Sequence, residues 1–422
     1  MAHDDTVIPR DLQPELSVTD SSRRFWLVVA TLGFAAAIGA LNGMSVNVFL
    51  PFIAEDLGSS VPVIGQMLTI VFLLGAGMVL ITGPLADWFG QRRFLLVGMV
   101  TVGITAAGAA LAQDVSEFVI ARLASTFASA VLISTSLAMA ATLYDGQQRR
   151  QAISWIVAST AGAPIVGVPI LTSIASMTSW RGAFIALVLV SAAASGVIAL
   201  LVPGPTGAQR HDIPFRMSEF LAAYPPLLTD RSMRPLYLSV LLRSIGWMGC
   251  LLYFGAYLRH AYAADHRAIG WAFMAAGGGF LVGSVFAGSM LKNVELRPLY
   301  SVASFTIAPC TAIAMLFPIS IIASVAAFSG AAICASIGQS SMATLLADTT
   351  PAGRNSTMSL NTAVASLGTA GGSLIGAVLI VVGGYALLGV GLAGFTALSA
   401  VLVVWPAIVS RAGSVTIEGS RA

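Results

Sequence analysis

The chain is predicted to be an all-α integral membrane protein that crosses the bilayer twelve times. Its 422 residues are 57% hydrophobic and only 9% charged, and its mean hydropathy is +0.88. A soluble domain is about 45–50% apolar and about 25% charged, so these charges are too few to cover a soluble surface. The same balance excludes intrinsic disorder. Twelve apolar stretches reach the roughly 20 residues that a helix needs to span a bilayer.

These stretches follow one another with mostly short connections. The polar segment 1–24 lacks the basic start and short apolar core of a cleaved signal peptide, so the first apolar run is predicted to be a true span. The predicted spans are 26–52, 62–83, 92–112, 117–143, 151–176, 181–202, 235–259, 267–291, 297–317, 319–347, 356–381 and 385–409.

One long connection, 203–234, holds five prolines and a charge cluster, and it lies between the sixth and seventh spans. We therefore predict a polar cytoplasmic tail (1–24), an N-terminal six-helix bundle (25–202), a cytoplasmic linker (203–234), a C-terminal six-helix bundle (235–410) and a cytoplasmic tail (411–422).

The basic residues are sorted between the two sets of loops, and this sorting predicts the orientation. Arg181, Arg259 and Arg267 occupy one set of loops. The opposite set carries Arg23, Arg24, Arg92, Arg93, Arg149, Arg150, Arg210, Arg216, Arg231, Arg234, Lys292, Arg297, Arg354 and Arg411. Because cytoplasmic loops carry the excess of basic residues, both termini are predicted to be cytoplasmic in a plasma membrane. The small net charge of +3 does not suggest nucleic-acid binding.

An internal repeat relates the two halves. Gly83 and Arg92, in the loop after the second span, recur 205 residues later as Gly288 and Arg297 after the eighth. The same offset takes Ser154 to Ser359 at the starts of the fifth and eleventh spans. Two repeated six-helix halves are the layout of many secondary transporters, whose substrate site lies between the halves near the midplane.

The loop after the second span carries a specific motif. It reads Gly83-Pro84-Leu85-Ala86-Asp87-Trp88-Phe89-Gly90-Gln91-Arg92-Arg93, and it resembles the loop 2–3 signature of the major facilitator superfamily. The resemblance implies a fold of two pseudo-symmetric six-helix bundles, a monomer that transports a small molecule by alternating access, and no cofactor. It also implies that Asp87, with Gly83, Gly90, Arg92 and Arg93, latches the two halves together. Trp88 and Gln91 depart from the usual basic residues.

The fifth predicted span carries a second motif, Gly162, Pro164, Gly167 and Pro169. It resembles the glycine- and proline-rich span five of the exporter branches, in particular the sugar, nucleoside and chloramphenicol efflux proteins. This resemblance implies an antiporter that exports drugs or metabolites and confers drug resistance.

The superfamily's fold implies that spans one, four, seven and ten surround the substrate cavity. Residues on these spans share helical faces that combine polar, arginine and aromatic side chains. The predicted cavity residues are Asn42, Asn47, Arg122, Ser125, Ser129, Arg243, Trp247, Phe254, Tyr257 and Gln339. For several of them a structural role is an alternative, because small polar residues also let membrane helices pack closely. Arg122 could also extend to the outer surface or pair with Glu117.

No acidic residue and no histidine falls in the middle of a predicted span. Neither a nucleophile with its base nor a metal site can be built there, so the protein is predicted not to be an enzyme and to bind no metal. Asn42 stands where some drug/proton antiporters carry an aspartate. A proton-linked cycle would therefore depend on peripheral groups, namely Asp87, Glu55, Asp56 or Glu117.

The two arginines predicted at membrane depth favour a neutral or anionic substrate. The main prediction is efflux of such a molecule. The alternative is an importer or facilitator of an organic anion recognised by Arg243.

Overall fold

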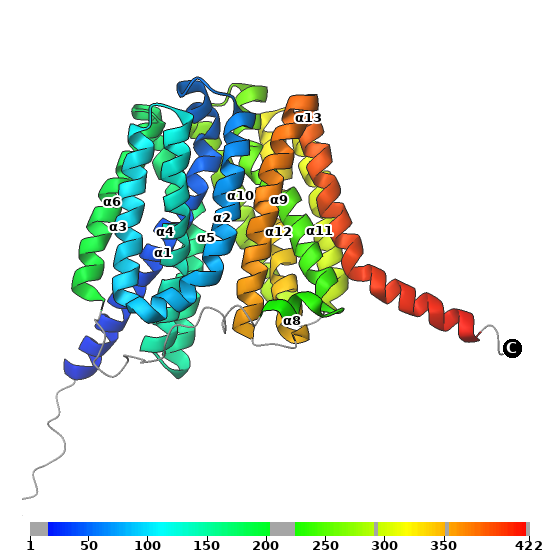
Figure 1. Cartoon of the computed structure of the whole chain (residues 1–422), viewed down its shortest axis with the longest axis horizontal. Coiled ribbons are helices and arrows are strands. Elements are labelled where there is room, and N and C mark those ends of the chain that lie inside the picture. The colour runs from blue at the N-terminus through cyan, green and yellow to red at the C-terminus, as the bar shows by residue number, and fades with distance from the viewer. Residues whose placement is uncertain (1–15, 203–223, 291–293, 351–353, 419–422) are drawn as a thin grey trace, which may run out of the picture.

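The computed structural model describes residues 16–202, 224–290, 294–350 and 354–418, and every regular element in these ranges is a helix (Figure 1). The helices are α1 (Leu16–Asp56), α2 (Val61–Phe89), α3 (Gln91–Leu111), α4 (Val115–Leu143), α5 (Gly146–Met177), α6 (Trp180–Leu201), α8 (Tyr224–Thr229), α9 (Met233–Tyr262), α10 (His266–Met290), α11 (Leu296–Leu316), α12 (Ile321–Thr349) and α13 (Arg354–Glu418).

Within the described ranges, eleven helices are long and apolar enough to cross a membrane, and one of them crosses twice. The apolar part of α13, Ser356–Val403, has 48 residues. At 1.5 Å per residue this is about 70 Å, more than twice the roughly 30 Å hydrocarbon core. The helix breaks at Gly383 and Gly384, where the chain reverses. The break falls in the predicted connection between spans eleven and twelve, so the predicted twelve crossings are present.

The break in α13 depends on glycine. Gly384 has φ 68° and ψ −164°, a region that is essentially restricted to glycine and costs other residues about 1–3 kcal/mol. Gly384→Ala should therefore lower the thermal unfolding midpoint of the purified protein. Gly394→Ala is the matched control, because Gly394 lies in the second arm of the same helix and an added Cβ would meet no atom within 4 Å. Equal midpoints for the two variants would contradict the conclusion that the backbone conformation at Gly384 requires glycine.

Helical structure extends beyond the predicted spans at several places. Helix α2 continues to Phe89, through most of the predicted loop after the second span, and α5 begins at Gly146. Helix α1 already begins at Leu16 and α13 continues to Glu418, both inside segments predicted to be polar tails. The described part of the linker contains the short helix α8, followed by Asp230, whose carboxylate accepts hydrogen bonds from the Ser232 and Met233 N–H groups. Hydrogen bonds from Ser232 hold the pKa of Asp230 below its usual range. Asp230 thus satisfies N–H groups where α9 begins.

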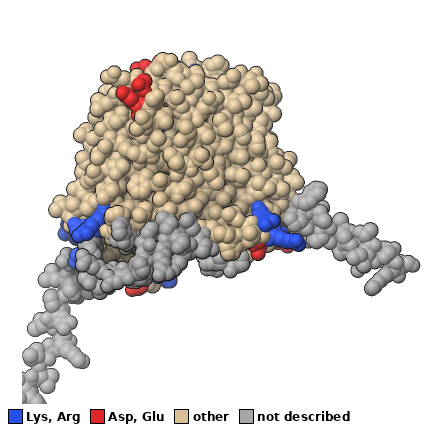
Figure 2. Space-filling model, viewed as in Figure 1, with Lys and Arg blue, Asp and Glu red and all other residues tan. Residues whose placement is uncertain are grey.

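The charged residues gather at the two ends of the helical bundle (Figure 2). On the face shown, a broad band without charged side chains separates them, as expected for a surface that contacts lipid. We call the end where the described chain begins and ends the arginine-rich end. The opposite end, which holds Glu55, Asp56, Asp114, Glu117 and Asp265, we call the acidic end.

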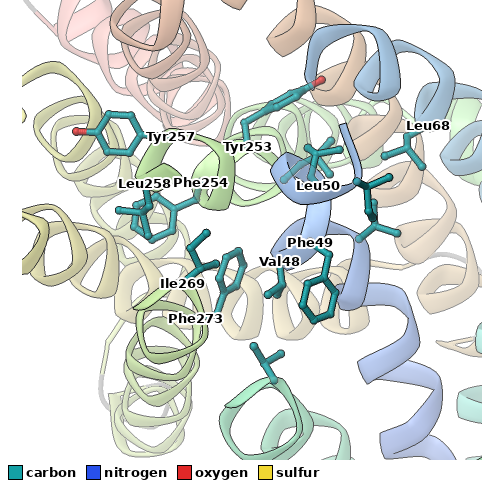
Figure 3. Close-up of a cluster of buried hydrophobic side chains, with 14 of the residues drawn as sticks. Val48, Phe49, Leu50, Leu68, Tyr253, Phe254, Tyr257, Leu258, Ile269 and Phe273 are labelled. Carbon is teal, nitrogen blue, oxygen red and sulfur yellow. The ribbon is translucent and has the colours of Figure 1, made fainter. Parts of the chain in front are cut away.

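Two groups of helices lie side by side in Figure 1, α1–α6 in one and α9–α13 in the other. Towards the arginine-rich end each group has its own buried cluster, around Leu32 in the first and Tyr300 in the second. Leu80 of α2 is a partly buried exception, because it packs against the second cluster. At the acidic end one buried cluster joins both groups. Figure 3 shows Val48 and Phe49 of α1 beside Phe273 of α10 in this cluster.

Candidate substrate site and the closed acidic end

Four of the predicted cavity residues form one hydrogen-bonded cluster between α1 and α4. The Asn42 side-chain amide donates to the hydroxyls of Ser125 at 3.1 Å and Ser129 at 2.8 Å. Arg122 donates through Nη1 to Asn42 Oδ1 at 3.1 Å and through Nη2 to the Asn42 carbonyl at 2.9 Å. The sequence places these groups together because Arg122, Ser125 and Ser129 share one face of α4. Asn42 therefore fastens α1 to α4 and holds the guanidinium.

A cavity of about 90 Å³ lies next to this cluster. It is lined by Gly43 and Val46 of α1, by Leu68, Val71 and Phe72 of α2, and by Arg122, Thr126 and Ser129 of α4. The wall from α4 is polar and basic, and the wall from α2 is apolar. The cavity therefore suits a small ligand group with an acidic or hydrogen-bonding head and an apolar stem.

The predicted face of α9 is buried in this structure. Arg243 is 6% exposed, and its Nη1 donates to the Ala335 carbonyl of α12 at 3.1 Å. Phe328 of α12 stacks on Phe254 with 3.8 Å between ring centroids and on Trp247 with 5.2 Å. The Tyr257 hydroxyl of α9 lies 3.4 Å from Ser324 Oγ of α12.

The structure does not bring the other predicted cavity residues into the Asn42 cluster. Asn47 is half-buried at the contact between α1 and α9, where its carbonyl faces Gly255. Gln339 is exposed on α12. A substrate-binding role for these residues and for the face of α9 therefore stays a prediction.

Side chains close the acidic end between the two groups of helices. Glu55 of α1 forms a two-point ion pair with Arg259 of α9, at 3.0 Å to Nε and 3.2 Å to Nη2. Phe52 stacks on His266 of α10 with 3.6 Å between ring centroids. Arg267 of α10 donates through Nε to Ser176 Oγ of α5 at 2.9 Å. The ion pair is half-exposed, and such pairs contribute at most about 1 kcal/mol.

A second ion pair stiffens the first group of helices at the same end. Asp56 pairs with Arg181 of α6 and accepts a hydrogen bond from Trp180 Nε1 at 3.2 Å. Glu117, the alternative partner considered for Arg122, instead accepts a hydrogen bond from the Gln113 N–H near the start of α4. Glu117 and Arg122 form no ion pair among the described residues.

The span-five motif lies in the part of α5 that packs against α1 of its own group on one side and against α10 of the other group on the other side. A Cβ on Gly167 would lie 2.7 Å from Leu41 of α1, so the glycine permits that close packing. On the other side, α5 meets α10: a Cβ on Gly277 would lie 3.1 Å from Ile165, next to Pro164. Pro164 and Pro169 are both inside the helix. An added Cβ on Gly162 would meet nothing within 4 Å.

The loop 2–3 motif is partly described. Gly90 joins α2 to α3 with φ 86°, a left-handed conformation that favours glycine. Arg92 donates through Nη2 to the Ala199 carbonyl of α6, and Arg93 is exposed. The surroundings of Gly83 and the side chain of Asp87 lie outside what the structure describes. The latch role therefore stays a prediction.

Two parts of the site were missed by reasoning from the sequence. Phe328 covers the aromatic face of α9, and Leu68, Val71 and Phe72 form the apolar wall of the cavity. All four sit in strongly apolar spans, where an apolar residue that faces lipid looks the same as one that faces a cavity. On α4, polar residues at helical spacing marked one face, whereas no such spacing marked the face on which these four residues lie.

Twelve membrane crossings, a repeated six-helix architecture and a polar site at membrane depth define a multi-span membrane transport protein. Major Facilitator Superfamily sequences match residues 32–258 and 236–422 of this chain, and the chain belongs to that superfamily. Its members are transporters and not enzymes, as predicted.

The chain is similar to several transport and resistance proteins over part of their length. It is 30% identical to the MFS-type transporter EfpA of Mycobacterium tuberculosis over 39% of this chain and 31% of that protein. It is 29% identical to the multidrug efflux pump LfrA of Mycolicibacterium smegmatis over 45% and 36% of the respective chains. The puromycin resistance protein of Streptomyces alboniger is 30% identical over 38% and 32%. These alignments span about a third of each relative's length.

The fold is similar to that of solved transporters. The nucleoside transporter NupG superimposes with a TM-score of 0.73 at 13% identity, over 89% of this chain and 98% of its own. A bacterial homolog of the human lysosomal transporter Spinster gives a TM-score of 0.68 at 15% identity, over 90% and 95%. These likenesses confirm the predicted fold class.

Proposed function

We propose that the protein is a secondary transporter that exports a small organic molecule across the plasma membrane by alternating access, with both termini cytoplasmic. The observation that carries the proposal is the way in which the acidic end is closed. Side chains of the two groups of helices meet there, through Glu55 and Arg259 and through Phe52 and His266. Such contacts can separate without breaking either group of helices, which is what alternating access requires.

In this orientation the acidic end faces outward, and the structure corresponds to a state closed to the outside. The sorting of arginines supports the orientation. The efflux and resistance relatives and the span-five motif support export as the direction. No carboxylate of the described chain lies in the middle of a span. Of the peripheral carboxylates that the structure describes and that were considered for proton coupling, Glu55 is the one that pairs across the two groups of helices, with Arg259.

The first test is drug resistance conferred on a pump-deficient bacterium by the full chain. The panel should vary in charge: chloramphenicol is neutral, nalidixate is anionic and ethidium is cationic. We expect at least fourfold resistance to a neutral or anionic compound and none to ethidium, with Gly394→Ala as an active control. Counterflow of the protected compound in proteoliposomes, with and without a pH gradient, then establishes transport and coupling. Increased sensitivity to the compound would indicate import and overturn the proposed direction.

A further inference from the structure

Arg122 is a buried cation, and no acid of the described part of the chain forms an ion pair with it. It is 4% exposed, and α4 carries it to membrane depth, where a charge is costly unless it faces a partner or a cavity. The ion pairs of the described residues use Arg181 and Arg259. The acceptors that Arg122 does have, Oδ1 and the carbonyl of Asn42, are neutral.

The guanidinium also keeps a donor in reserve. Nη1 and Nη2 each donate to Asn42, whereas Nε is buried and has no hydrogen-bond partner. Leaving a buried donor of a charged group unpaired costs more than leaving a neutral one unpaired. A ligand acceptor near Arg122 would gain a charge-assisted hydrogen bond.

The 90 Å³ cavity provides the space for that acceptor. Arg122, Thr126 and Ser129 line one wall, and Leu68, Val71 and Phe72 line another. Gly43 is exposed, and a Cβ there would meet no atom within 4 Å, so the cavity is open beside α1. Among the described residues that line the cavity, Arg122 alone carries a charge, which matches one negative charge better than two.

Arg243 is also buried, and its Nε likewise has no hydrogen-bond partner, so the two arginines differ only in what surrounds them. Its Nη1 donates to the Ala335 carbonyl, and the side chain of Tyr300 interacts with it as well. Arg243 does not line the 90 Å³ cavity, and the neighbouring aromatic residues are stacked on Phe328. Of the two arginines predicted to bind substrate, the structure favours Arg122.

We propose that the cavity beside Arg122 binds the carboxylate of an acidic, amphipathic substrate, with the adjoining apolar stem against α2. The inference rests on the proposed function in that the bound molecule is also the one transported. The chemistry commits to a monoanion: one guanidinium balances one charge, and the Ser129 hydroxyl, which accepts from Asn42, still has a proton to donate. Val71 and Phe72 offer apolar contact to the stem.

The test is direct binding to the purified full chain in detergent, so that it does not depend on transport. Benzoate is the probe, benzamide is its neutral counterpart and chloride represents a free inorganic anion. In gluconate buffer, we expect benzoate to bind at least tenfold more tightly than benzamide or chloride, by calorimetric titration or thermal shift. Arg122→Gln should weaken benzoate binding at least tenfold, whereas Arg243→Gln should change it less than twofold.

A second variant keeps the charge and fills the space. Gly43→Leu should weaken benzoate binding at least tenfold while leaving Arg122 intact. This variant still tests the proposal if Arg122→Gln does not fold. Equal binding of chloride and benzoate, undetectable benzoate binding, a larger loss in Arg243→Gln, or full binding in Gly43→Leu would each overturn the proposal. If benzoate binds as expected but the full chain confers no resistance and gives no counterflow of any panel compound, the binding site stands and it is the proposed function that fails.

Discussion

Replacing Gly255 by valine is expected to abolish transport by preventing closure of the acidic end. Gly255 lies on α9, and a Cβ built there would sit 2.9 Å from the Asn47 carbonyl oxygen of α1 and 3.4 Å from the Phe273 ring. A main-chain oxygen cannot rotate away as a side chain can, so a valine forces the two groups of helices apart. Overpacking of this kind costs about 1–3 kcal/mol, and each 1.4 kcal/mol shifts a two-state equilibrium about tenfold.

The shift can be measured as accessibility of a buried position at the acidic end. Thr172 of α5 is 1% exposed and packs against Gly270 of α10. In a background where Cys250, Cys310 and Cys334 are replaced, Thr172→Cys should react slowly with a membrane-impermeant maleimide added outside. Adding Gly255→Val should raise the labelling rate at least tenfold and reduce counterflow to background.

Gly394→Ala is the control for the loss of a glycine. Its added Cβ meets no atom within 4 Å, so labelling and transport should match the parent protein. Unchanged labelling together with full transport in Gly255→Val would show that the contact between Gly255 and Asn47 does not control closure.

The fold was largely predictable because membrane spans are recorded directly in composition. Backbone groups in lipid must be satisfied within a helix, so each span needs a long apolar run, and the predicted boundaries fall within a few residues of the helices. The break at Gly384 was also predictable, since an apolar segment that is twice the bilayer thickness must turn. The helical ends of α1 and α13 were not, because polar residues continue a helix as readily as they form a tail.

The candidate site was predictable only where polarity has a period. Arg122, Ser125 and Ser129 stand out on α4 because they recur at helical spacing and include an arginine within a span, and Asn42 stands out as one of the few polar residues in the apolar part of α1. The pairing of Asn42 with Arg122, instead of Arg122 with Glu117, depends on how α1 lies against α4. That arrangement is set by close packing of small and apolar residues, which leaves no distinctive pattern in either helix.

Asn42→Asp is expected to remove anion binding and to make transport depend on the pH gradient. The Asn42 Oδ1 already accepts from Arg122 at 3.1 Å, so a carboxylate in the same place would form a buried ion pair with almost no change in shape. The hydroxyls of Ser125 and Ser129, which accept from the amide at present, can rotate and donate instead. The site would lose its net positive charge and gain a titratable group, so protonation of the new carboxylate would restore the charge of Arg122.

Two measurements test this prediction. Benzoate affinity at pH 7.5 should fall at least tenfold in Asn42→Asp and recover as the pH is lowered through the pKa of the new carboxyl. Counterflow of the exported compound should acquire a dependence on the pH gradient stronger than that of the parent. Asn47→Asp is the matched control, since it adds the same charge to the same helix at a residue outside the Arg122 cluster, whose main-chain carbonyl lies against Gly255 of α9. An equal loss of benzoate binding in both variants would mean that added negative charge on α1, and not neutralisation of Arg122, is responsible.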